Sequence, residues 1–240
     1  MRRKAILCWF LIFSFFTADA QWRSGIKAGV NLSRFTQEID PFARNSEYYD
    51  DYIGFKQFIR AGANAGFTLE HRATSSFSVG SELLYSSRGA MYRIRNPYVT
   101  LVDGEGEQKR AYDSYTYQVN YIELPLYFQM NTGYFRKSAF DIYAGVAPAY
   151  AIKSRRIYRY YEGSGVVAAG DQQKKSKPLD HVRNTNLFPL AGVKAGTEKA
   201  YFDMRLSFPL LPVFAKSKNP DGSNLTTRTW SVGLTGGLYF

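Results

Sequence analysis

Cysteine is almost absent: the 240 residues contain one, Cys8. It lies in the apolar stretch 5–16, between the basic start Met1-Arg2-Arg3-Lys4 and the small residues Ala18-Asp19-Ala20. A basic start, a short apolar run and an Ala-x-Ala site are typical of a secretory signal peptide. A membrane helix needs about 20 apolar residues, more than this run supplies. We therefore predict a leader over residues 1–20, removed before Gln21.

A chain that loses Cys8 with its leader has no thiol, which excludes disulfides, thiolate metal sites and cysteine nucleophiles. Histidine is scarce too, with only His71 and His181. Glycine-rich phosphate loops and His/Cys/Asp/Glu clusters with metal-ligand spacing are also missing. We expect no enzyme activity, no cofactor and no metal. A rim enzyme acting on outer-membrane lipid, built on His181 and Asp180, is an alternative.

Negative charge is in short supply, because 31 Lys and Arg residues face 20 Asp and Glu residues and leave a net charge of +11. A basic balance favours anionic partners such as nucleic acid or an anionic membrane surface. An exported protein meets lipid rather than nucleic acid. We expect outer-membrane lipid and lipopolysaccharide as partners, and no nucleic acid.

Long hydrophobic runs are missing after the leader, but apolar residues alternate regularly at the carboxyl end. In residues 229–240, Trp230, Val232 and Leu234 share one face, while Ser231, Gly233 and Thr235 share the other. A strand that is apolar outside and polar inside is typical of a transmembrane β-barrel. The final Phe240 resembles the terminal aromatic by which the barrel-assembly machinery recognises its clients during insertion. The sequence therefore predicts a cell outer membrane location.

The same period-two alternation occurs in eight segments, which predict an all-β, eight-stranded antiparallel up-and-down transmembrane barrel over residues 21–240. The segments are 22–35, 57–71, 76–92, 114–130, 139–153, 184–198, 201–213 and 229–240. Long connections alternate with short ones, as expected for long extracellular loops and short periplasmic turns. A soluble β-sandwich, the main alternative, has no reason to place every long loop at one end.

Charged residues alternate with the apolar ones and therefore face the predicted lumen. They are Lys27, Arg60, Arg88, Lys194, Arg205, Glu70, Glu82, Glu123, Asp141, Glu198 and Asp203. Unpaired buried charges are costly, so we expect a structural network of ion pairs. Eight strands enclose an interior that side chains just fill, which disfavours an open pore. A conduction path and a small ligand pocket are the alternatives.

Two predicted outer loops have distinct chemistry and are candidate binding surfaces. The first, 36–56, is acidic and aromatic, and the third, 154–183, is basic with interleaved tyrosines. The residues singled out are Tyr48, Tyr49, Asp50, Asp51, Arg155, Arg156, Arg159, Lys174, Lys175 and Lys177. Anionic glycan, lipid A phosphates or a partner protein are the ligands that this chemistry favours, and ordinary solvated rim residues are the alternative. Asp50 and Asp51 also leave open a calcium site.

Three phrases resemble the PorT-like family of outer-membrane β-barrel proteins: residues 81–89 (Ser-Glu-Leu-Leu-Tyr-Ser-Ser-Arg-Gly), residues 121–126 (Tyr-Ile-Glu-Leu-Pro-Leu) and residues 143–148 (Tyr-Ala-Gly-Val-Ala-Pro). The closing Leu-Thr-Gly-Gly-Leu-Tyr-Phe fits as well. The resemblance implies an OmpX-like or OmpA-like eight-stranded membrane domain without a catalytic motif. It also implies, for some members, a role in type IX secretion. We expect a non-enzymatic structural or interaction protein, with an accessory of protein secretion as the alternative, and a secretion-system or cell-surface protein as partner.

Overall fold

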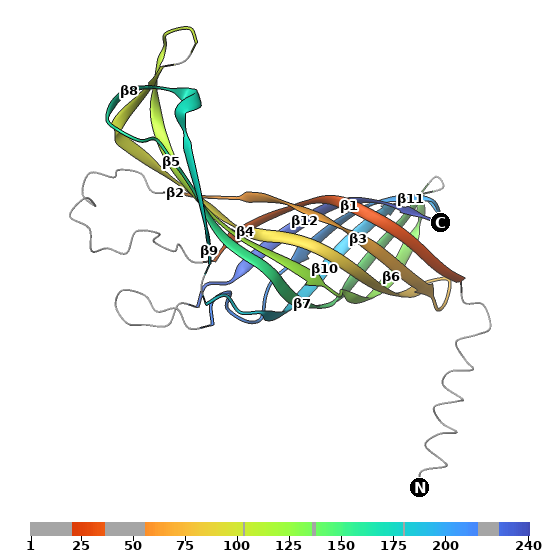
Figure 1. Cartoon of the computed structure of the whole chain (residues 1–240). Coiled ribbons are helices and arrows are strands. Elements are labelled where there is room, and N and C mark those ends of the chain that lie inside the picture. Colours follow the sequence, from red (N-terminus) through yellow and green to blue (C-terminus); the bar gives the residue numbers. More distant parts are fainter. Residues whose placement is uncertain (1–20, 37–55, 103, 136–137, 180, 216–225) are drawn as a thin grey trace.

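The computed structural model describes residues 21–36, 56–102, 104–135, 138–179, 181–215 and 226–240 (Figure 1). Its elements are β1 (Gln21–Phe35), β2 (Lys56–Phe58), β3 (Arg60–Arg72), β4 (Phe77–Val102), β5 (Gln108–Glu123), β6 (Leu126–Phe135), β7 (Ser138–Tyr160), β8 (Gly165–Ala168), the 3-10 turn η1 (Ala169–Asp171), β9 (Gln173–Pro178), β10 (Thr185–Gly196), β11 (Ala200–Ser207) and β12 (Thr229–Tyr239). Within the described residues, no helix is long and apolar enough to cross a membrane.

The strands close into a ring, which confirms the predicted antiparallel all-β barrel (Figure 1). Going round, β12 pairs with β1, β1 with β3, and β3 with β4. On the other side β7 pairs with β10, β10 with β11, and β11 with β12, and all of these ladders are antiparallel. Between β4 and β7 lie β5 and β6, each paired with both neighbours. A closed ring leaves no unpaired sheet edge.

The sheet has twelve strands rather than the eight that the sequence predicted. One reason is Pro125, which has no backbone N–H and lies between β5 and β6 along the chain, where it interrupts their pairing with β4. The neighbouring backbone is still satisfied, since Pro125 O accepts a hydrogen bond from Glu82 N at 3.0 Å. The short strands β2, β8 and β9 account for the remaining difference.

Period-two alternation sorts side chains between the two faces of the ring. β11 shows it clearly, because exposed and buried residues alternate along its whole length. Exposed large apolar side chains on the outer face include Ile26, Val30, Phe67, Leu83, Phe128, Ile142, Phe202, Met204 and Leu238. Polar and charged side chains fill the inside. This is the apolar-out, polar-in pattern of a membrane barrel.

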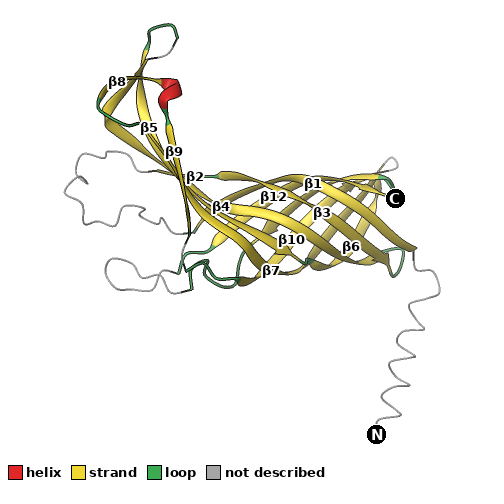
Figure 2. Ribbon diagram, in the orientation of Figure 1, coloured by secondary structure: helices red, strands yellow, loops and turns green. Residues whose placement is uncertain are grey.

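At one end of the barrel, β4, β5 and β7 continue beyond the ring as a projecting sheet, which we call the arm (Figure 1). Its strand order is β8–β4–β5–β7–β9, with β8 parallel to β4 and the other pairs antiparallel. Figure 2 shows η1 as the single helical turn in the arm. β1 begins and β12 ends at the opposite end of the barrel, which we call the turn end.

The arm corrects the predicted loops. Residues 93–113, expected to be a connection, are the upper parts of β4 and β5 around a short turn. Residues 154–183, expected to be a loop, extend β7 and then form β8, η1 and β9. The physical reason is tyrosine packing: Tyr115 of β5 stacks across the strands on Tyr158 of β7 with 4.3 Å between ring centroids. Tyr158 also stacks on Tyr160, two positions along the same strand, at 4.6 Å.

Candidate functional site

The middle of the lumen holds a four-residue ion cluster from β1, β4 and β11: Lys27, Glu82, Asp203 and Arg205. Lys27 Nζ lies 3.1 Å from Glu82 Oε1 and 2.6 Å from Asp203 Oδ2. Arg205 lies 2.8 Å from Glu82 and 3.4 Å from Asp203. All four side chains are buried, so each charge is compensated where solvent is excluded.

Tyrosines link this cluster to a second ion pair nearer the turn end. Arg205 Nε donates to the Tyr143 hydroxyl at 2.9 Å, and that hydroxyl donates to Asp203. Lys194 pairs with Glu70 and donates to the Tyr127 hydroxyl at 2.8 Å. Neither Tyr127 nor Tyr143 was singled out from the sequence, although both fall on the inward face of their segments.

A third pair lies nearer the arm. Arg88 makes a two-pronged contact with Glu123, with Nε 2.8 Å from Oε1 and Nη2 2.9 Å from Oε2. Its remaining Nη1 donates to Ser207 at 2.8 Å, and the guanidinium lies 4.1 Å from the centroid of the Phe188 ring. Parallel N–H donors on a carboxylate form a strong and geometrically specific hydrogen-bonded pair.

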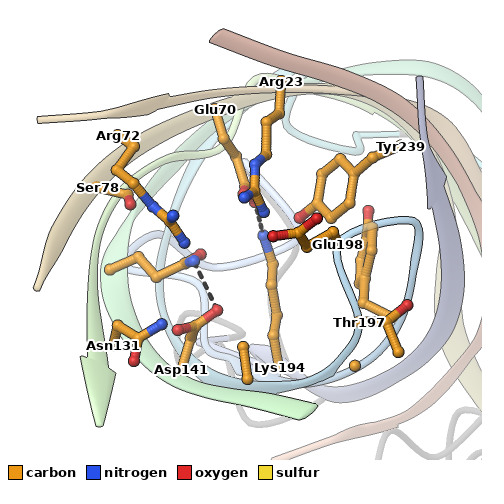
Figure 3. Close-up of a pocket in the computed structure, with 14 residues that line it drawn as sticks. Arg23, Glu70, Arg72, Ser78, Asn131, Asp141, Lys194, Thr197, Glu198 and Tyr239 are labelled. Carbon is orange, nitrogen blue, oxygen red and sulfur yellow. Dashed lines mark hydrogen bonds and ion pairs between the residues drawn. The ribbon is translucent and has the colours of Figure 1, made fainter. Parts of the chain in front are cut away.

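The structure does not place every predicted lumen residue in an ion pair of the described part of the chain. Arg60 donates to Ser87 Oγ at 3.1 Å, and Asp141 accepts from Gln129 at 2.9 Å. Glu198 is exposed at the turn end. Figure 3 shows Asp141 and Glu198 with Lys194 around a pocket there, which offers water about 30 Å³ of space.

At the arm end, an aromatic cluster closes the lumen. Phe35 lies 5.9 Å from Tyr117 and 6.3 Å from Phe214, measured between ring centroids. Tyr92 meets Tyr117 edge-on at 5.8 Å. All four side chains are buried. This cluster and the ion pairs nearer the turn end line the described barrel interior with buried side chains.

The inner face of the arm continues this core around a buried carboxyl. Asp113 accepts hydrogen bonds from the Tyr158 hydroxyl at 3.2 Å and from the backbone N–H of Tyr161 at 3.3 Å. Burial raises the pKa of Asp113 above its ordinary value, although these donors oppose the shift. Burial also raises the pKa of Tyr115 to about 12. The arm is therefore packed on one face.

The other face of the arm carries a row of four cations with one serine among them, which we call the outer row. Its residues are Lys56, Arg93, Ser114, Arg159 and Lys174. Register places them side by side across β2, β4, β5, β7 and β9. Lys56 stands directly opposite Arg93, and Arg159 directly opposite Lys174. All four cations are exposed, and none is in an ion pair with an acid of the described residues.

The predicted basic surface is thus divided between two faces. Arg155, Arg159 and Lys174 lie on the outer face, whereas Arg156, Lys175 and Lys177 share the inner face with Tyr158. Lys175 Nζ lies 4.8 Å from the centroid of the Tyr160 ring. The predicted acidic and aromatic residues of the first loop, Tyr48, Tyr49, Asp50 and Asp51, lie outside the described residues.

Lys56 and Arg93 were missed from the sequence. Arg93 is a charged residue between two apolar ones, Tyr92 and Ile94, which are both buried. This alternation is a signal that the strand continues past residue 92. Lys56 gives no local signal, because its position depends on pairing with a distant strand.

The histidines and the acidic groups form no evident reaction centre in the described part of the chain. His181 has a positive φ of 59° in a turn, and its carbonyl accepts from Ala215 N at 2.7 Å. Asp180 lies outside the described residues. Among those described, no three His, Cys, Asp or Glu side chains are grouped to hold a metal ion.

Comparison with known proteins gives a family match over most of the chain. A family profile described as "Outer membrane protein beta-barrel domain" matches residues 17–240. No curated protein matches the sequence.

Three solved structures are similar at low identity. The attachment invasion locus protein Ail of Yersinia pestis is 14% identical, with a TM-score of 0.36, and the match covers 92% of this chain and 99% of that one. The N-terminal β-barrel domain of Pseudomonas aeruginosa OprF is 13% identical, with a TM-score of 0.29 and coverage of 92% and 100%. The outer membrane protein OprG of Pseudomonas aeruginosa is 12% identical, with a TM-score of 0.31 and coverage of 92% and 95%.

Proposed function

Because the chain belongs to the outer membrane protein beta-barrel domain family, we propose that it is a non-enzymatic integral barrel whose task is carried by its arm, outside the cell. The observation that carries this proposal is the combination of a filled lumen with a projecting sheet. The ion clusters and the aromatic closure occupy the barrel interior, while the arm presents exposed cations beyond it.

The filled lumen supports an interaction role over a conduction role. In this proposal the ring has eight staves, with β2 and β3 forming one and β5 and β6 another. About eight strands give an interior just wide enough for side chains, whereas aqueous channels are typical of 16 or more. The buried ion pairs then act as structure, because each one leaves no isolated charge in the interior.

Orientation is part of the same proposal. The turn end faces the periplasm and the arm faces outward, since outer-membrane barrels have short periplasmic turns and longer extracellular segments. Residues 1–20 act as the cleaved signal peptide, and Phe240 as the terminal aromatic that the barrel-assembly machinery recognises.

The partners we propose are outer-membrane lipid and lipopolysaccharide, with no nucleic acid and no cofactor. The exposed cations of the arm support an anionic partner. Membership of the PorT-like group and a part in type IX secretion rest on the three motif segments and the closing residues 234–240. A cell-surface protein partner rests on the chemistry of the two predicted outer loops. A lipid-modifying rim enzyme rests on His181 with Asp180, and the turn conformation of His181 gives it no added support.

Single cysteines test the proposal, because Cys8 is the only natural one and lies in the predicted leader. Glu105→Cys, at the arm tip, is expected to react with a membrane-impermeant maleimide on intact cells, whereas Thr197→Cys, at the turn end, is expected to react only after lysis. Purified protein in planar bilayers is expected to show no steady conductance. Labelling of Thr197→Cys on intact cells would mean that the barrel has the opposite orientation. A reproducible channel current would contradict the proposal that the lumen is closed.

A further inference from the structure

We propose that the outer row is a binding site for the phosphate groups of lipopolysaccharide in the surrounding outer leaflet. This inference rests on the proposed function and assigns it a ligand and a set of residues. The site consists of Lys56, Arg93, Arg159 and Lys174, with Ser114 at its centre.

Like charges stand opposite each other at both ends of the outer row. Lys56 opposite Arg93, and Arg159 opposite Lys174, place cation against cation across adjacent strands. Directly opposed side chains have Cβ atoms about 4.5–5.5 Å apart, and like charges in that position destabilise a sheet. Among the described residues no acid forms an ion pair with these four cations, and an arrangement that breaks a local rule is expected at functional sites. A bound anion removes the repulsion.

Protection of a sheet edge explains only some of the cations in the outer row. Lysines and a proline on an edge strand protect it from pairing with other chains, and β9 has Lys174, Lys175, Lys177 and Pro178. Edge protection therefore accounts for the lysines of β9. It does not account for Arg93 or Arg159, because β4 and β7 are flanked by strands on both sides within the arm.

The side chains of the outer row are of the types that bind phosphate. Arginine presents a planar fork of donors that matches phosphate, and Lys is a compact point charge that also binds it. Arg93 is further oriented by Phe58, whose ring centroid lies 5.1 Å from its guanidinium carbon. The Ser114 hydroxyl supplies a neutral donor between the two arginines, in register with both.

The position of the outer row along the barrel favours lipid over a protein partner. Along β7, the outward face runs from the exposed apolar Tyr150 and Ile152 to Lys153, Arg155 and Arg159. At about 3.3 Å per residue, Arg159 lies about 23 Å along the strand beyond Ile152, and less along the membrane normal because barrel strands tilt. The row therefore faces sideways into the headgroup layer around the barrel, where lipopolysaccharide has its phosphates and acidic sugars.

The experiment measures binding of purified detergent-solubilised protein to lipopolysaccharide, and to the same lipopolysaccharide after enzymatic dephosphorylation. The test variant combines Arg93→Gln, Arg159→Gln and Lys174→Gln. The matched control combines Lys175→Gln, Lys177→Gln and Lys199→Gln, which removes the same charge away from the outer row. Near an anionic surface each Lys or Arg is worth roughly a fivefold change in affinity, so the test variant should lose roughly 100-fold.

We expect the control to bind within about threefold of the unaltered protein, and dephosphorylation to weaken binding of the unaltered protein as the test variant does. Equal binding by the test variant, equal loss in the control, or indifference to dephosphorylation would each overturn the proposal. A second variant, Arg93→Lys with Arg159→Lys, keeps the charge and should keep most of the affinity.

Folding is checked in every variant by the heat-dependent gel mobility shift. If the test variant does not fold, the comparison of intact with dephosphorylated lipopolysaccharide tests the proposal on the unaltered protein alone. Binding in detergent does not depend on which end of the barrel faces outward. Loss of the proposed binding site would show in the detergent assay while the cysteine labelling stays as expected. A wrong orientation would show in the labelling alone, so the two failures are distinguishable.

Discussion

Lys27 on β1 and Asp203 on β11 meet inside the barrel with 2.6 Å between Nζ and Oδ2, although 176 positions separate them in the sequence. Their strands are not neighbours, since β12 lies between them. Thr235 of β12 adds a hydroxyl 3.4 Å from the same carboxylate oxygen. The contact therefore passes over β12 on the lumen side, beside the joint where β12 pairs with β1.

Replacing Lys27 by methionine should destabilise the barrel by about 3–5 kcal/mol, because Glu82 and Asp203 keep their buried charges and lose a shared cation. Urea unfolding of the protein in lipid vesicles, followed by tryptophan fluorescence, measures this. Lys199→Met, at an exposed turn, is the control and should change stability by less than about 0.5 kcal/mol. Equal effects of both substitutions would mean that the ion cluster does not stabilise the fold.

The Arg88–Glu123 pair predicts a different pattern. Arg88→Leu or Glu123→Leu alone leaves one buried charge and should cost about 3–5 kcal/mol, whereas the double substitution should be close to neutral. A double-mutant cycle with the same unfolding assay gives the coupling. Additive losses would contradict the pairing, since independent residues show no coupling energy.

Gly89, where β4 leaves the ring, should not tolerate a side chain. Its φ is 149°, and a Cβ there would lie 1.9 Å from the carbonyl oxygen of Tyr117. Gly89→Ala should therefore cost at least about 1–3 kcal/mol through backbone strain and displacement of β5. Gly104→Ala is the matched control, because its Cβ meets no atom within 4 Å. Unchanged stability in both variants would show that the base of the arm relaxes freely.

Asp113 predicts an arm that is more stable in mild acid. Burial raises the pKa of this carboxyl in the folded state, so the folded arm holds a proton more tightly than the opened arm. Stability is then highest below the ordinary pKa of 3.8 and falls as the pH rises through the raised value. Amide exchange in β5 and β7, corrected for its intrinsic pH dependence, measures arm opening.

Asp113→Asn is the control for that prediction, since an amide does not titrate and keeps an acceptor oxygen for Tyr158 and Tyr161. The pH dependence between pH 4 and neutrality should largely disappear in this variant. A slope that survives the substitution would assign the effect to another group.

Sequence alternation predicted which side chains face inward in most of the ring, because one buried face fixes register strongly. Lys27, Glu82 and Arg205 were placed on the lumen side for that reason. The ends of the strands were placed poorly. Alternation continues through Tyr92, Arg93 and Ile94. The charged residues that follow Tyr92 favoured a loop, so the predicted strand ended too early.

The local sequence pattern could not predict on which face of the arm each cation lies, and the reason is physical. A register shift between β5 and β7 leaves Ile152 as an extra residue and exchanges the inward and outward positions above it. The alternation of β7 before Ile152 would place Arg156 on the outer face and Arg155 on the inner face. In the structure Arg155 lies on the outer face and Arg156 on the inner face. The opposition of Lys56 and Arg93 depends in addition on where β2 docks, which only the tertiary structure decides.

The ladder between β1 and β12, from Gly25 opposite Tyr239 to Phe35 opposite Thr229, also constrains how the protein is made. Until those two strands pair, both carry open rows of N–H and C=O groups, which hydrocarbon cannot satisfy. Residues 229–239 therefore supply the partner for β1 as well as for β11. A chain without them would leave two strands of the ring with an open edge in the hydrocarbon, so closure of the ring depends on its first and last described strands together.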